Sequence, residues 1–252
     1  KDGGTDAGRL EIGSDLNLWR TASGLVGYWP FEGTGAISNG QTNGLEDFSG
    51  NSNNGTASNV NGSGMTFTTG KVGSAVQFDG ADDSIQLLSN TESVLGSNPN
   101  EWSYSIWFKK NSSAGKQEFL SNYDSVTGSD GLVGIWAGIN YSANKVFVNV
   151  RGTGAPEYIN SPSSYNYNDN IWHHFAVTAK KGSYVRGYID GVELMTSTLG
   201  TSDYIDDAPL RTGALRYNSV FQEFLGGSTD EICIYSKILS ASEVRSIYNA
   251  GK

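Results

Sequence analysis

The sequence predicts an all-β fold, in which two antiparallel sheets pack face to face and one short helix follows at the C-terminal end. The 252 residues include 33 glycines and 12% aromatic residues, a composition typical of strands joined by many turns. Apolar and polar residues alternate over several short segments, which is the pattern of half-buried strands. No helical pattern separates these segments, so we expect them to pair as antiparallel strands in two packed sheets.

The first 23 residues differ from the rest and are predicted to form an N-terminal stem or linker. Their apolar residues have only loosely helical spacing. The chain starts at a lysine with no signal peptide, as expected at a processing boundary. The folded domain is predicted to cover residues 24–252 as one unit.

The first and last strands are predicted to pair and so to close one sheet. In Leu25–Phe31, Trp29 and Phe31 alternate with Tyr28 and Pro30. Pro30 cannot donate to a strand ladder, so an edge position or a strand end is expected there. Ile232–Tyr235 is a short β-branched and aromatic run behind a glycine pair, which indicates a strand.

Other strands are predicted between these two because apolar and polar residues alternate along them. Asp190-Gly191 lies between two such runs in Tyr184–Thr196 and predicts a hairpin with a type I′ turn. The remaining strand segments are Ala75–Leu88, which forms two strands, Trp102–Lys109 and Lys145–Arg151. The apolar members of their alternation are Val76, Phe78, Ile85, Leu87, Tyr104, Ile106, Phe108, Val146, Val148 and Val150.

Two further segments complete the prediction. Gly33 to Gly70 is rich in Gly, Asn and Ser and is predicted to be a long polar loop, for which a bound metal or ligand is the usual reason. Ser240 and Glu243 have the spacing of a capping box and begin the C-terminal helix. Gly251 is expected to end that helix in the left-handed conformation.

Six sequence blocks, taken in order, resemble the concanavalin A-like, laminin-G-like jelly-roll domains. The blocks are Gly24–Gly33, Asp47–Gly55, Gly70–Gly80 with Asp82 and Asp83, Trp172–Thr178, Tyr188–Gly191, and Thr229–Tyr235 followed by Leu239-Ser240. The match runs from about Gly24 to Gly251. The resemblance implies a two-sheet antiparallel jelly-roll sandwich, and since one fold hosts many activities, it leaves function to be argued from a site.

Composition excludes two classes of partner. The net charge of −9 argues against nucleic acid, because binding phosphates requires a basic stripe. No apolar run approaches the ~20 residues that a membrane-spanning helix needs. An acidic surface suits cations or neutral ligands.

A structural calcium ion is predicted, because Ca²⁺ prefers several carboxylate, amide and backbone oxygens. The loop after Asp47 supplies many such oxygens, notably from Asn51 and Asn53. Similar jelly rolls hold a calcium ion near the junction of the first and last strands, so the resemblance adds Asp230 and Glu32. The acidic segment Asp203–Asp207 is a second candidate, and a solvated turn without an ion is the alternative.

Glycan binding requires exposed aromatic faces beside polar groups, because sugar C–H faces stack on rings while hydroxyl groups need hydrogen-bond partners. Aromatic residues in or beside turn-rich segments are the candidates, although tyrosines can also cover the ends of a sandwich without a ligand. These candidates are Trp136, Tyr141, Tyr158, Tyr165 and Tyr167.

Catalysis is not expected. Glucanases of this fold carry a Glu-x-Asp-x-x-Glu strand, since two acids must flank the scissile bond, and this chain has no such pattern. His173 and His174 would face opposite sides of a strand and cannot form one relay. Cys233 lies within the last strand, where a reactive thiolate is not expected.

We therefore expect a non-catalytic extracellular recognition domain that binds glycans and holds a structural calcium. Its partner would be a glycan or a surface protein. The alternative is a structural head domain of a bacterial surface appendage or an adhesin, because residues 1–23 resemble the tail of a pilin-like stem.

Overall fold

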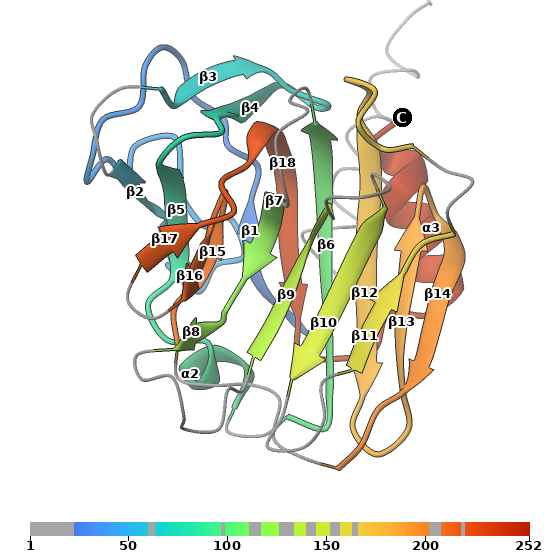
Figure 1. The fold of residues 1–252 in the computed structure, drawn as a ribbon. Helices are drawn as coiled ribbons and strands as arrows, with labels where there is room; N and C mark the ends of the chain where they lie inside the picture. Colours follow the sequence, from blue (N-terminus) through green and yellow to red (C-terminus); the bar gives the residue numbers. More distant parts are fainter. Residues whose placement is uncertain are drawn as a thin grey trace, which may run out of the picture.

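The computed structural model is a sandwich of two large antiparallel β-sheets with a helix on one outer face (Figure 1). It describes residues 23–59, 64–96, 99–110, 117–125, 134–139, 145–151, 157–162, 166–201, 208–217 and 220–252. The predicted stem, apart from Ser23, lies outside these residues. No helix in the described part of the chain is both long and apolar enough to cross a membrane.

Sheet A has the strand order β14-β13-β12-β6-β18-β4-β3, and β1 pairs with β18 in addition. Its strands are β1 (Leu25–Trp29), β3 (Thr66–Thr69), β4 (Ser74–Asp79), β6 (Glu101–Lys110), β12 (His173–Lys180), β13 (Tyr184–Ile189), β14 (Val192–Thr198) and β18 (Gly226–Tyr235). The predicted pairing of first and last strands is confirmed, with Leu25 opposite Tyr235 and Trp29 opposite Ile232. Strand β1 ends directly before Pro30, which has no amide hydrogen to donate.

Sheet B has the order β11-β10-β9-β7-β15-β5-β2. Its strands are β2 (Thr56–Asn59), β5 (Asp83–Leu88), β7 (Gln117–Ser121), β9 (Gly134–Ile139), β10 (Val146–Arg151), β11 (Glu157–Asn160) and β15 (Leu210–Thr212). A small sheet C, with β8 (Asp124–Ser125), β16 (Leu215–Tyr217) and β17 (Val220–Gln222), and a one-turn helix α2 (Glu92–Leu95) add to the predicted architecture.

The main hydrophobic core lies between sheets A and B. All ten apolar residues of the predicted alternation are buried within it, which confirms the inward faces of β4, β5, β6 and β10. Trp29 and Phe31 are also fully buried there. A fully buried aromatic or aliphatic side chain contributes roughly 1.5–3 kcal/mol to stability, so this shared core holds the two sheets together.

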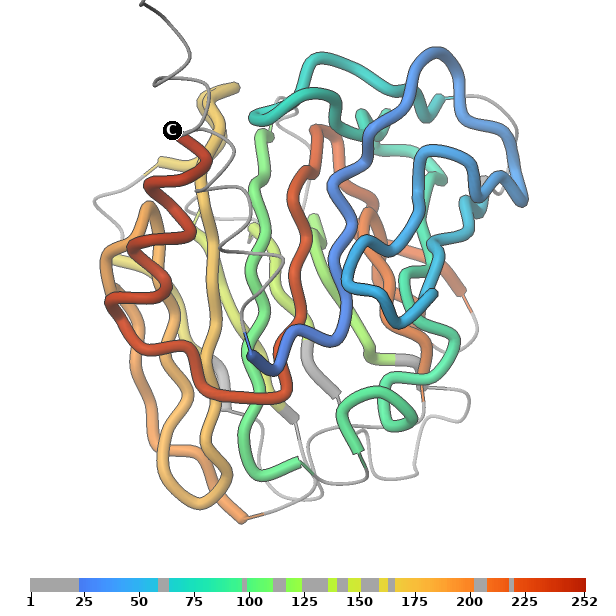
Figure 2. The backbone as a smooth tube through the Cα atoms, turned by 180° about the vertical axis from the view of Figure 1, so that it is seen from behind, coloured from blue at the N-terminus to red at the C-terminus, as the bar shows by residue number. Residues whose placement is uncertain are grey.

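Helix α3 (Ala241–Ala250) covers the outer face of sheet A (Figure 2). The predicted capping box is present, since Ser240 accepts from the Glu243 amide and the Glu243 side chain accepts from the Ser240 amide. Val244 and Ile247 are buried in a second cluster with Tyr28, Ala176, Tyr188, Cys233, Tyr235 and Leu239. The helix therefore seals the outer side of β1, β12, β13 and β18.

The end of this helix differs from the prediction. Gly251 has a φ of −88°, so it does not adopt the left-handed conformation that we expected. A Cβ atom at this position would lie 2.7 Å from Nε1 of Trp107. Glycine is required here because the backbone approaches the Trp107 ring, and not because of its φ.

The tight turn predicted at Asp190-Gly191 is confirmed. The two residues join β13 to β14, since Ile189 lies opposite Val192. Both have positive φ, 51° and 76°, as a type I′ turn requires.

The segment from Gly33 to Gly70 is not the purely polar loop that the sequence predicted. It contains β2 and β3, and Ile37, Leu45 and Met65 are buried in the main core. These widely spaced apolar residues pack the segment against the core. Packing therefore explains part of the ordering for which the sequence suggested an ion or a ligand.

Candidate functional site

One row of paired residues crosses all seven strands of sheet B. From β2 to β11, neighbouring strands bring these residues opposite one another: Thr56, Gln86, Arg211, Ser121, Trp136, Asn149 and Tyr158. In β10 the residues on either side of Asn149, Val148 and Val150, point into the core. Because side chains alternate along a strand, the row belongs to the outer face of sheet B, which faces the viewer in Figure 1.

Aromatic residues gather at this face. Trp136 and Phe147 form a cluster with Tyr123 and Leu215, and Tyr217 of sheet C packs against it. The Trp136 and Tyr123 rings have centroids 4.4 Å apart, and Tyr123 stacks on Tyr217 at 6.0 Å. Sheet C thus covers this aromatic cluster, whose four members are buried.

Polar groups lie directly beside the aromatic rings. Asn149, opposite Trp136, is 92% buried, and its Oδ1 atom has no hydrogen-bond partner among the described residues. Arg211 lies two strands away from Trp136, with its guanidinium 5.5 Å from the ring centroid of Phe221. A buried carbonyl oxygen without a donor costs free energy, so Asn149 is an unsatisfied acceptor buried at this face.

The predicted aromatic residues are only partly brought together. Trp136 lies in the row, and Tyr158 is paired with Asn149 across β10 and β11. Tyr167 is buried, packed edge-on against His173 at 5.1 Å, so it presents no free ring face. Trp136 is also mostly covered. Tyr141 and Tyr165 lie outside the described residues. The acidic segment 203–207 does as well.

The polar members of the row were not predicted from the sequence. Gln86, Arg211 and Asn149 come from strands that are far apart in the chain, so only their pairing reveals the row. Asn149 alone had a local signal, because it interrupts the apolar run Val146–Val150 at an outward position.

The loop predicted to hold calcium is ordered by hydrogen bonds. The Asp47 carboxylate accepts from the amides of Tyr28, Ser49 and Asn53, at 2.8–3.0 Å, and from the Ser49 hydroxyl. Asn51 and Asn53 donate through their side chains to the Val26 carbonyl. These bonds account for the loop without an ion, and calcium at Asp47 stays a prediction.

The other two predicted ligands flank the turn between β3 and β4. Asp230 accepts from the amides of Lys71 and Val72 at 2.8 and 3.1 Å, and Glu32 accepts from the amide of Ser74. Among the described residues, Asp47, Glu32 and Asp230 are not a group whose ligand atoms all lie within 4.8 Å. The three predicted carboxylates are thus not gathered around one point, and the calcium site stays a prediction.

Substituting Asp47 by alanine is expected to lower the free energy of unfolding by about 3 kcal/mol, because four donors lose a charged acceptor. Urea unfolding with EDTA and with CaCl₂ measures the effect. Glu46→Ala, one residue earlier, is the control and should change stability by less than about 0.5 kcal/mol. A loss that occurs only with calcium would show that an ion, and not these bonds, orders the loop.

The two histidines have structural roles on opposite faces of β12, as predicted. His173 bonds Asp190 at 2.8 Å and Asp169 at 3.2 Å. His174 lies 2.8 Å from the Ser105 hydroxyl, but its Nδ1 atom has no partner, so no carboxylate orients the ring. Burial lowers the pKa of His174 to about 4, which keeps it neutral. The buried pair of His174 and Ser105 thus lacks the carboxylate that a catalytic relay requires.

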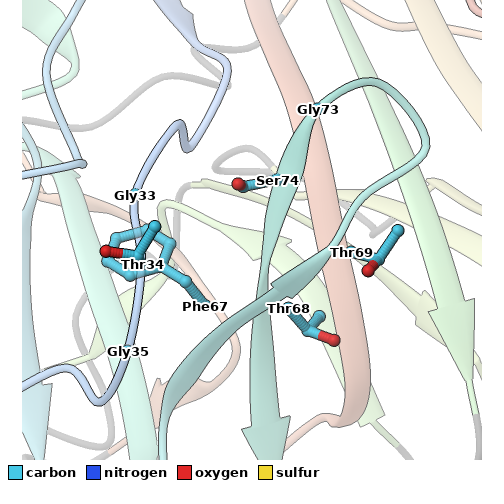
Figure 3. Close-up of a pocket in the computed structure, with 8 residues that line it drawn as sticks. All are labelled: Gly33, Thr34, Gly35, Phe67, Thr68, Thr69, Gly73 and Ser74. Carbon is cyan, nitrogen blue, oxygen red and sulfur yellow. The ribbon is translucent and has the colours of Figure 1, made fainter.

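A shallow pocket of about 430 Å³ lies at the edge of sheet A (Figure 3). Its lining is made of glycine backbone, threonine and serine residues and Phe67. The Phe67 ring packs against Gly33 and Gly44, where any Cβ atom would clash with it. The ring is thus used in packing, and the outer face of sheet B has the richer set of aromatic and polar groups.

Solved structures show the same fold at low sequence identity. Domain 4 of AbnA, an arabinanase from Geobacillus stearothermophilus solved with arabinotriose, is 20% identical (TM-score 0.65, covering 89% of this chain and 98% of that one). The binding domain of botulinum neurotoxin DC is 16% identical (TM-score 0.60), and the match covers 91% of this chain and 52% of the toxin chain.

A third structure is the CBM40 domain of a Ruminococcus gnavus sialidase bound to α2,3-sialyllactose (16% identity, TM-score 0.51, covering 60% of this chain and 83% of that one). The comparison with curated proteins gave no match. A family model described as concanavalin A-like lectin/glucanases superfamily matches residues 78–245, from β4 into α3. The chain therefore belongs to the concanavalin A-like lectin/glucanase superfamily.

Proposed function

We propose that this protein is a non-catalytic carbohydrate-recognition domain that acts outside the cell and binds glycans on the outer face of sheet B. The observation that carries the proposal is the row across sheet B, in which Trp136 lies opposite Asn149 and two strands from Arg211. Sugars are held by aromatic rings that contact C–H groups and by amide or guanidinium groups that bond hydroxyl oxygens. The row holds both kinds of residue side by side, with Trp136 and Asn149 each 8% exposed at the outer face.

The similar structures support this ligand class. AbnA domain 4 was solved with arabinotriose and the sialidase CBM40 with sialyllactose. The first of these domains belongs to an extracellular enzyme. A fold shared with sugar-binding domains, together with an outward row of sugar-binding residue types, favours glycan recognition over a purely structural role.

The composition of the row supports a non-catalytic role. Hydrolysis of a glycosidic bond requires two carboxyl groups, about 5 to 9.5 Å apart, on either side of the scissile bond. The row contains neither aspartate nor glutamate. Its groups can orient a sugar, but they cannot supply both the acid and the nucleophile or base.

Asn149→Ala is expected to weaken glycan binding about tenfold, because a lost hydrogen bond in a mostly buried site is worth roughly 1.4 kcal/mol. A glycan array run with and without calcium would first identify a ligand, with arabinotriose and sialyllactose included as probes. Titration calorimetry would then compare the variant with the unaltered protein.

Phe48→Ala is the matched control. Phe48 is an exposed aromatic residue beside Tyr28 of sheet A, away from the row, so its removal should leave affinity unchanged. Melting curves must show that both variants are folded. No binding to any glycan on the array would reject the proposed function. Full binding by Asn149→Ala and also by Trp136→Phe would place the ligand elsewhere.

A further inference from the structure

Three carboxylates converge at the turn between β4 and β5. Asp79 ends β4, Asp83 begins β5, and Asp82 lies in the turn between them. One ligand oxygen from each lies within 4.8 Å of the other two. Within the part of the chain that the structure describes, no other set of three His, Cys, Asp or Glu side chains has this geometry.

Asp83 sets this cluster apart from an ordinary acidic turn. The residue is only 1% exposed, and its Oδ1 atom has no hydrogen-bond partner. Its Oδ2 atom accepts a single long bond, 3.3 Å, from the Asp79 amide. Removing a carboxylate from water without a compensating partner is costly. The buried carboxyl group faces two further carboxylates, so only the long bond from the Asp79 amide offsets its burial.

No positive side chain in the described residues offsets this charge. Ion pairs form elsewhere, as between Lys180 and Glu101 or between Lys237 and Glu243, but none involves the three aspartates. The site is therefore short of positive charge, which a bound cation can supply.

We propose that Asp79, Asp82 and Asp83 bind one divalent cation, with Ca²⁺ as the best match. Calcium–oxygen distances are 2.3–2.6 Å, so two ligand atoms on opposite sides of the ion are about 5 Å apart. The three aspartate oxygens satisfy this limit. All three ligands are hard oxygens, whereas zinc and the softer metals favour nitrogen and sulfur. Backbone carbonyls and water complete the coordination.

A cation here would strengthen the junction between the two sheets. Strand β4 belongs to sheet A and β5 to sheet B, so this turn carries the chain from one sheet to the other. Gly80 in the turn packs against the start of β18, since its Cβ atom would lie 3.1 Å from Cα of Gly226. An ion that binds only the folded turn therefore stabilises the folded chain. This proposal does not rest on glycan binding.

The test compares the 252-residue chain in EDTA and in CaCl₂ at pH 7.5. At a calcium concentration 100 times the dissociation constant, we expect the melting temperature to rise by about 5 °C. Calorimetry with CaCl₂ alone should show one site per chain. MgCl₂ should have a smaller effect, because Mg²⁺ requires a tighter octahedral geometry.

Asp83→Asn and Asp82→Asn should each remove most of the calcium-dependent rise, whereas Asp47→Asn should keep it. Asp82 is partly exposed, so its variant stays informative if Asp83→Asn does not fold. Equal melting temperatures in EDTA and CaCl₂ would overturn the proposal. A full calcium response in both site variants would do so as well, because the ion would then bind elsewhere.

Discussion

A chain that ends at Leu225 is expected to lose cooperative unfolding altogether. The deletion removes β18, which pairs with β1, β4 and β6 and whose ten residues are all buried. Without it, sheet A is divided into β14-β13-β12-β6, β4-β3 and an unpaired β1, and helix α3 is lost too. Backbone groups left buried without partners cost free energy, and no neighbouring strand can replace so many pairs.

Differential scanning calorimetry of the truncated chain measures this effect. A chain that ends at Lys237 is the control: it keeps β18, loses only α3, and should melt cooperatively at a lower temperature. A sharp transition of the Leu225 truncation near the temperature of the full chain would contradict the central place of β18.

Stability is expected to fall steeply as pH rises, because of Asp230. This residue lies beside Glu231 at a bulge where the partner of β18 changes from β4 to β1. Burial, together with the charge of Glu231, raises the pKa of Asp230 to about 9. In an unfolded chain the pKa is about 3.9. Between these values the folded state retains a proton that the unfolded state releases.

The stabilisation is therefore complete below about pH 4 and is lost as pH rises toward 9, at about 1.4 kcal/mol per pH unit. Urea unfolding at pH 5.5, 7 and 8.5 measures the slope. Asp230→Asn cannot ionise and should flatten this slope, while Glu92→Gln, a substitution in the first turn of α2, should not. Parallel curves for Asp230→Asn and the unaltered chain would mean that the amides of Lys71 and Val72 hold Asp230 charged.

Local patterns predicted most of the fold. Strand alternation, the capping box at Ser240 and the Asp190-Gly191 turn each depend on residues close in sequence, and each is confirmed. The fold of the segment from Gly33 to Gly70 was harder to predict, because Ile37, Leu45 and Met65 are too widely spaced to show a period. These residues are buried by tertiary packing, which no short stretch of sequence reveals.

The candidate sites were less predictable for the same reason. Arg211 and Gln86 are 125 residues apart in sequence but lie opposite each other in sheet B. Register between distant strands depends on the whole sheet, so single-strand patterns cannot give it. The three aspartates are close in sequence, but the burial of Asp83 depends on packing that the acidic turn does not reveal.

The chain also contains its own reporter of sheet opening. Cys233, the single cysteine, lies in β18 beneath Tyr28 and helix α3, is 1% exposed, and has a pKa raised well above its usual value by burial. A thiol reagent can reach it only when α3 or β1 separates from sheet A. The rate of labelling in native buffer thus gives the frequency of that opening directly, without denaturant and without an introduced probe.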